Sequence, residues 1–169
     1  MQQYIQEVHK ALNNQCYLAA LALSLTLPDI CAQVENGIKE SNRSYYIDWV
    51  NNHMNAEDYH FPIPEFETQT FTGEMCYSLR CKVLHNGNTD VSNQKLNVLI
   101  DDFVLLRPGD PDYYHGYRYE QKKGTNNANI LKTYIGVDYL CETICEAVEL
   151  FYNGWPNKTD FDNHYVWRK

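Results

Sequence analysis

The chain has 169 residues, enough for one domain with a buried core. Hydrophobic residues make up 44% and charged residues 21%, which is close to the usual mixture of a globular protein. The formal net charge of -8 argues against broad, non-specific binding of nucleic acid, which needs a basic surface, but it permits one local basic cleft.

The first residues, Met1 to Tyr4, lack the basic and apolar regions of a signal peptide. The longest apolar stretch, residues 18–27, is about half as long as the ~20 residues that span a bilayer. We therefore expect a cytoplasmic protein with no membrane partner, in which thiols stay reduced. Because no C-x-x-C pair occurs, we expect the cysteines to be small buried hydrophobic side chains and not disulfides or zinc ligands.

Residues 3–35 are predicted to be helical, with a middle part so apolar that it favours a central position in the fold. Pro28 is expected to kink this helix or to start a new one, which places Asp29 in a first turn. Asn36-Gly37 is a typical helix end, and Ser41 or Asn42 can cap the next helix.

Residues 55–67 contain two prolines and are predicted to be an ordered loop. Thr70 or Thr72 can cap a further helix, which has Glu74 in its first turn and is stopped by Gly87.

Beyond Gly87 the apolar residues alternate as in strands, in segments 95–106, 113–120 and 130–135, which favours a small antiparallel meander. Asp138 is expected to cap a last helix over about 138–153. The predicted fold is mainly α: one domain over 1–169, a helical bundle with a small antiparallel β-sheet inserted at about 95–135, and thus α+β overall.

Arg80 and His85 form the pattern that best fits chemistry. Five residues apart on a regular helix, they would lie about 140° apart around its axis. They can converge only if the helix ends near His85, and Asn86-Gly87 is such an ending. Arginine offers a planar fork that suits phosphate, and histidine can act as a general acid or base near neutral pH. The pair therefore suits cleavage of an RNA phosphodiester without a metal, since the 2′-hydroxyl is a built-in nucleophile.

The Arg80-x4-His85 spacing, within a small helical bundle, resembles the HEPN superfamily, whose hallmark is an arginine, four to six residues, and then a histidine. The resemblance covers about residues 3–87 and the last helix. It implies a metal-independent ribonuclease of the toxin–antitoxin or phage-defence kind, a homodimer with two motifs at one composite site, an RNA substrate and a protein partner such as an antitoxin. It implies Arg80 and His85 as catalytic residues, and Glu74, Asp29 and Asn86 as candidate supporting residues. It implies no cofactor and no metal.

Other interpretations stay open. Cys81 stands where active members of the superfamily often have asparagine, and many relatives are inactive, so a non-catalytic regulatory or interaction protein is the alternative. Arg80 could also pair with Glu74 and His85 could cap the helix, both for purely structural reasons. The remaining histidines show no metal-binding spacing.

Overall fold

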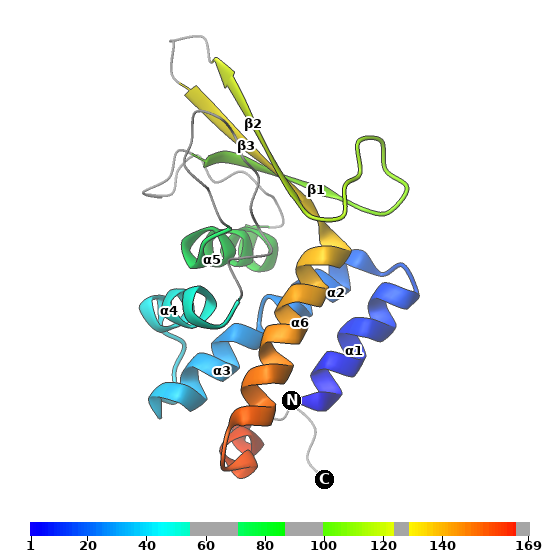
Figure 1. Ribbon diagram of the computed structural model, residues 1–169. Helices are drawn as coiled ribbons and strands as arrows, with labels where there is room; N and C mark the ends of the chain where they lie inside the picture. Colours follow the sequence, from blue (N-terminus) through cyan, green and yellow to red (C-terminus); the bar gives the residue numbers. More distant parts are fainter. Residues whose placement is uncertain (55–70, 87–99, 124–128, 165–169) are drawn as a thin grey trace.

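The computed structural model describes residues 1–54, 71–86, 100–123 and 129–164 of the chain. Over these ranges the protein is mainly helical, and a small three-stranded sheet precedes the last long helix (Figure 1). The prediction of a mainly helical fold with a small sheet at this place in the chain is confirmed.

Three helices occupy the region that was predicted as helical over 3–35. They are α1 (Gln2–Asn13), α2 (Tyr17–Ser24) and α3 (Leu27–Asn36). The break after α1 contains Gln15, whose φ of 58° lies in the left-handed region and cannot continue a right-handed helix. Pro28 stands in the first turn of α3, where its missing N–H costs nothing, so it starts a helix and does not kink one. Gly37 ends α3 with a left-handed φ of 62°, as predicted.

By length and composition alone, the segment Tyr17–Asn36 is apolar enough to cross a membrane. Its most apolar part is 56% buried inside the protein. The core helix of a soluble protein can have the same length and apolar composition as a membrane-spanning helix. In the structure the segment is divided between α2 and α3, which both bury side chains in the core.

The helices α4 (Arg43–His53) and α5 (Gly73–Cys81) start at the predicted caps. Asn42 Oδ1 accepts the N–H of Ser44 at 2.9 Å, and Thr72 Oγ1 accepts the N–H of Met75 at 3.3 Å. The predicted loop over 55–67 lies outside the described residues, as does Thr70.

Gly73 fixes how closely α5 approaches α4. A Cβ atom at this position would lie 2.3 Å from the backbone oxygen of Ile47, so no larger residue fits without a shift of the backbone. The N–H of Gly73 also donates to Asn51 Oδ1 at 2.7 Å. The first turn of α5 is thereby held directly against α4.

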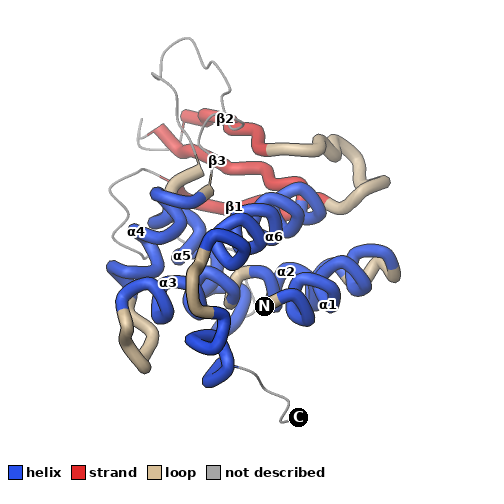
Figure 2. Tube along the Cα trace, turned by 60° about the horizontal axis from the view of Figure 1, so that its bottom comes forward, coloured by secondary structure: helices blue, strands red, loops and turns tan. Residues whose placement is uncertain are grey.

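The sheet contains β1 (Ile100–Leu106), β2 (Tyr117–Lys123) and β3 (Asn129–Gly136) in the order β1-β3-β2. β3 pairs antiparallel with β2 but parallel with β1, so the predicted antiparallel meander is wrong and the sheet is mixed. Residues 107–116 connect β1 to β2 and are long enough to leave room for β3 between them. Figure 2 shows the strands as one layer along one side of the helices.

The last helix, α6 (Val137–Gly154), follows β3 directly and matches the predicted helix over 138–153. The prediction that Asp138 caps this helix is wrong, because Gly136 takes that place. Asp138 Oδ2 instead accepts a hydrogen bond from the hydroxyl of Tyr113 at 2.6 Å. The buried face of α6 packs on α1, α2 and α3 and completes the helical core. A short 3-10 helix, η3 (Lys158–His164), then returns to α3 and buries Phe161.

Phe71 connects the sheet to the helical layer. Its ring stacks on Tyr117 with centroids 4.7 Å apart, and it meets Phe103 edge to face at 6.5 Å. All three side chains are buried, so the sheet packs on the core next to the start of α5.

Candidate functional site

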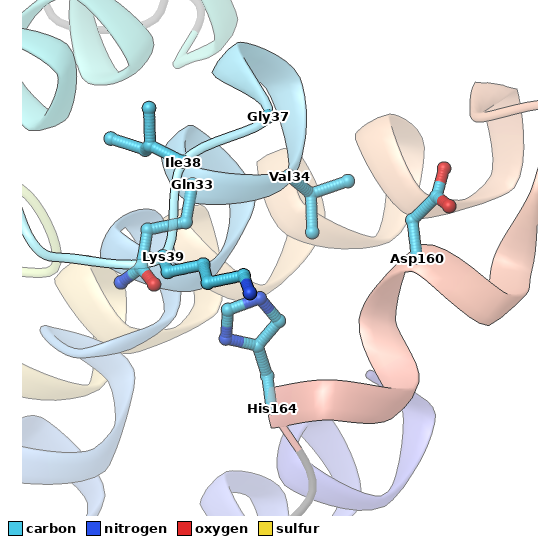
Figure 3. Close-up of a pocket in the computed structure, with 7 residues that line it drawn as sticks. All are labelled: Gln33, Val34, Gly37, Ile38, Lys39, Asp160 and His164. Carbon is cyan, nitrogen blue, oxygen red and sulfur yellow. The ribbon is translucent and has the colours of Figure 1, made fainter.

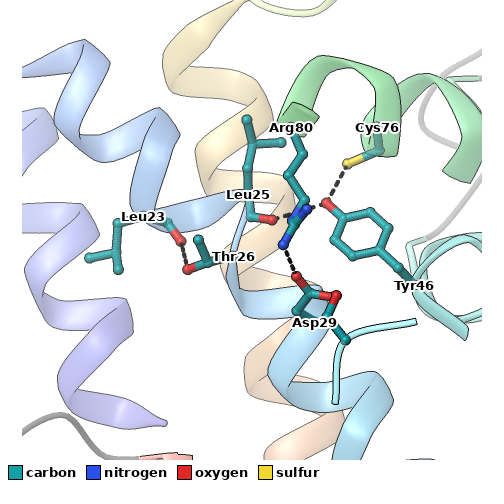
Figure 4. A network of polar contacts seen from close by, with 8 residues as sticks. Leu23, Leu25, Thr26, Asp29, Tyr46, Cys76 and Arg80 are labelled. Carbon is teal, nitrogen blue, oxygen red and sulfur yellow. Dashed lines mark hydrogen bonds and ion pairs between the residues drawn. The ribbon is translucent and has the colours of Figure 1, made fainter. Parts of the chain in front are cut away.

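Arg80 stands in the last turn of α5 and forms an ion pair through Nη2 with Asp29 Oδ2 (Figure 4). The side chains of Arg80 and Asp29 are only 15% and 9% exposed. Two charges from helices far apart in the sequence therefore meet in a largely buried place at the end of α5.

Asp29 has a second partner. Ser41 Oγ donates to Asp29 Oδ1 at 2.7 Å, so the connection between α3 and α4 also touches this carboxylate. Glu74, the other predicted supporting acid, instead lies 3.9 Å from Arg43. The structure brings together Arg80 and Asp29 and leaves Glu74 outside the pair.

Two tyrosine rings enclose the guanidinium of Arg80. Its Cζ lies 5.7 Å from the ring centroid of Tyr46 and 5.7 Å from that of Tyr77, distances at which a cation is attracted to an aromatic face. The Tyr46 hydroxyl also donates to the Leu25 carbonyl at 3.1 Å. Sequence reasoning missed both tyrosines as site residues, although Tyr77 stands three positions before Arg80, on the same side of α5.

Cys76 Sγ lies 3.3 Å from the Tyr46 hydroxyl. Burial raises the pKa of Tyr46 well above its ordinary value and raises the pKa of the Cys76 thiol to about 12. Both groups stay protonated at neutral pH, so neither serves as an anionic nucleophile.

Arg80 Nε is buried and has no hydrogen-bond partner in the part of the chain that the structure describes. An unsatisfied buried donor costs about 1–3 kcal/mol. The site thus holds its arginine in place through charge and ring contacts while one polar atom remains unpaired.

A π-helix, η2 (Lys82–Asn86), continues α5 and contains His85 and Asn86. Hydrogen bonds in a π-helix run from i to i+5, so the turn is wider than in an α-helix, and backbone positions five apart come closer to the same side. His85 lies within this wider turn, and Arg80 lies in the α-helical turn just before it. The helix stop that was predicted at Asn86-Gly87 stays a prediction, because Gly87 and the side chains of His85 and Asn86 lie outside the described part.

A separate hollow of about 640 Å³ lies between the end of α3 and η3 (Figure 3). Lys39 and His164 both line it, and burial lowers the pKa of His164. Asp160 also lines it, but its carboxylate accepts Trp155 Nε1–H at 2.8 Å and Asn157 Nδ2–H at 2.8 Å. Among the described lining residues, none is Arg80, Asp29 or Glu74.

The cysteines only partly match the prediction that all of them are buried. Cys16, the residue before α2, is exposed, and Cys81, the last residue of α5, is half-buried. The other four are buried, and all six thiols are free. Within the described ranges, no group of three or more His, Cys, Asp or Glu side chains is placed to hold a metal ion.

Comparison with known proteins gives no match to a family model, to a curated protein or to a solved structure.

Proposed function

We propose that this chain is a HEPN-like, metal-independent endoribonuclease whose site is built on Arg80 and His85. The observation that carries the proposal is the Asp29–Arg80 ion pair beside the wide turn of η2. A buried ion pair generally stabilises a fold no better than apolar residues of the same size, so its presence here supports a functional use of Arg80. Single π-helical turns also occur frequently at functional sites.

Arg80 is the residue that binds the scissile phosphate. Its ion pair with Asp29 uses Nη2, and a guanidinium carries five N–H donors, so it can bind a phosphate oxygen without leaving Asp29. Its 15% exposure leaves a narrow approach for such a ligand. The tyrosine rings fix its orientation, which favours stabilisation of charge in the transition state.

His85 is the general acid or base. In the proposed step a neutral histidine removes the proton of the RNA 2′-hydroxyl, whose oxygen then attacks the neighbouring phosphorus. The P–O5′ bond breaks and the departing oxygen takes a proton from a second acid, which leaves a 2′,3′-cyclic phosphate and a 5′-hydroxyl. In a homodimer the second acid is the same histidine of the other chain.

The test is cleavage of a mixed RNA pool by purified protein in the presence of a chelator. We expect wild-type protein to give 2′,3′-cyclic phosphate ends, and Arg80→Lys and His85→Ala to lose at least 100-fold in rate, the lower range for a general acid or base. His9→Ala, at an exposed position of α1, is the matched control and should cleave like wild type. Absence of any cleavage by wild-type protein would overturn the proposal.

The ion pair between Arg80 and Asp29 also favours a second function, that of a catalytically inactive protein. Asp29 already neutralises the charge of Arg80, and most of the side chain is covered. A catalytically inactive HEPN-like module that regulates or binds another protein, such as an antitoxin, needs only such a structural role for Arg80. It predicts no RNA cleavage, and a stable partner that Arg80→Lys still binds.

A further inference from the structure

The surface beside Arg80 offers a place for a longer piece of RNA, an inference that rests on the proposed ribonuclease function. Arg43 is the first residue of α4, and its Cζ lies 5.6 Å from the ring centroid of Tyr77. The Cζ of Arg80 lies 5.7 Å from the same centroid. The guanidinium groups of Arg43 and Arg80 therefore both lie next to the ring of Tyr77. A few nucleotides of one RNA strand can span the distance between these two groups.

Arg43 and another exposed arginine, Arg107, differ in how tightly each is bound to a neighbouring acid. Arg43 is 51% exposed, and its ion-pair contact with Glu74 is 3.9 Å long, at the outer limit for such a pair. Arg107, on the other side of the molecule, is similarly exposed at 62%, but it binds Asp110 through two nitrogens at 2.9 and 3.1 Å. Arg43 is thus held by its acid more weakly than Arg107 and is the better placed of the two to bind an outside anion.

A hollow of about 410 Å³ lies along the connection between α3 and α4, and Asn42, the residue before Arg43, is part of its lining. It is lined by Ile38, Lys39, Glu40, Ser41, Asn42 and Tyr45. Ser41 links this hollow to the ion pair through its bond with Asp29. Tyr45 is half-buried and supplies an aromatic ring of the kind on which single-stranded bases stack.

We propose that Arg43 and this hollow bind single-stranded RNA on one side of the scissile phosphate held by Arg80. Arg43 contacts the backbone phosphate next to the scissile one, and Tyr45 stacks a base. Glu40 is the one acidic side chain among the described residues of the lining and opposes a polyanion there. Arg43, Arg80 and Lys39 offset the acidic net charge of the protein only along the short surface between Arg80 and this hollow.

The experiment measures binding of a 2′-O-methyl RNA strand, which cannot be cleaved, by fluorescence anisotropy at several salt concentrations. We expect Arg43→Ala to weaken binding several-fold and to reduce the slope of log K against log salt by about 0.7, the value for one phosphate contact on a single strand. Arg43→Lys should recover part of the loss, Glu40→Gln should tighten binding, and Arg107→Ala is the matched control with wild-type affinity. In cleavage assays Arg43→Ala should raise KM with little change in kcat.

The outcomes separate the two proposals. If wild-type protein cleaves RNA while Arg43→Ala and Arg107→Ala behave alike, this binding path is wrong and the ribonuclease proposal stands. If wild-type protein binds the strand through Arg43 but cleaves no RNA, the path is correct and the catalytic proposal fails. If wild-type protein neither binds nor cleaves RNA, both are overturned.

Discussion

Arg80 and Asp29 depend on each other because each would be a buried, unpaired charge without the other. We expect Asp29→Leu alone to lower the free energy of unfolding by about 3–5 kcal/mol, the usual cost of breaking a buried pair. The double variant Asp29→Leu with Arg80→Met should recover most of that loss, because it removes both charges. Urea unfolding of the three proteins measures this difference.

The control for that experiment is Glu74→Gln, which removes an acid of α5 that forms a long ion pair with the half-exposed Arg43. Its effect should stay below about 1 kcal/mol, as for other surface ion pairs. A double variant as unstable as Asp29→Leu would show that the two charges do not compensate each other.

For single residues, the sequence predicts where each site residue lies within its own helix. It does not predict that Asp29 and Arg80 form an ion pair. Pro28 places Asp29 in a first turn, and Thr72 with Gly87 places Arg80 towards a helix end. The choice of Asp29 over Glu74 depends on how α3 lies against α5, which no local pattern contains. The tyrosine rings around Arg80 were missed for the same reason, since Tyr46 comes from α4 and its place beside Arg80 depends on how α4 packs on α5.

The close approach of α5 to α4 at Gly73 gives a prediction for a whole element. Gly73→Ala puts a methyl group 2.3 Å from the Ile47 oxygen, and we expect a loss of about 1–3 kcal/mol in stability, as for other overpacked positions. Gly154→Ala is the matched control, since nothing lies within 4 Å of its added carbon. Thermal unfolding of both variants measures the contrast, and equal melting temperatures would contradict it.

Element types were predictable here because their signals are local, whereas their partners are not. The caps at Asn42 and Thr72 and the left-handed Gly37 follow from residue type and position. Alternating residues predict a strand but do not say which neighbour it pairs with. The parallel pairing of β1 with β3 therefore replaced the expected meander, and the spacing of apolar residues predicted a helix at 82–86 but not its π-helical form.

The buried thiols make the whole molecule sensitive to alkaline pH. Burial raises the pKa of Cys76, Cys141 and Cys145 from the ordinary 9.0 to about 12. The folded state therefore keeps these thiols neutral, and their contribution is fully present below about pH 9. It is lost as pH rises from there towards 12, because the unfolded chain releases protons first.

We accordingly expect the free energy of unfolding to fall between pH 8.5 and about 10 by urea titration, with a shallower fall for Cys76→Ala. Cys16→Ala removes an exposed thiol and should keep the wild-type slope. Identical slopes for all three proteins would show that buried thiols do not govern the alkaline limit.

The junction between β3 and α6 has no connecting residue: the strand ends at Gly136 and the helix begins at Val137. A Cβ atom at Gly136 would lie 2.6 Å from the Tyr114 oxygen, so the joint is also confined from the side. The chain from Asn129 to Gly154 therefore passes from the sheet into α6 without a loop, and α6 packs on α3, the helix of Asp29. One uninterrupted strand and helix thus connect the sheet to the helix that carries the partner of Arg80.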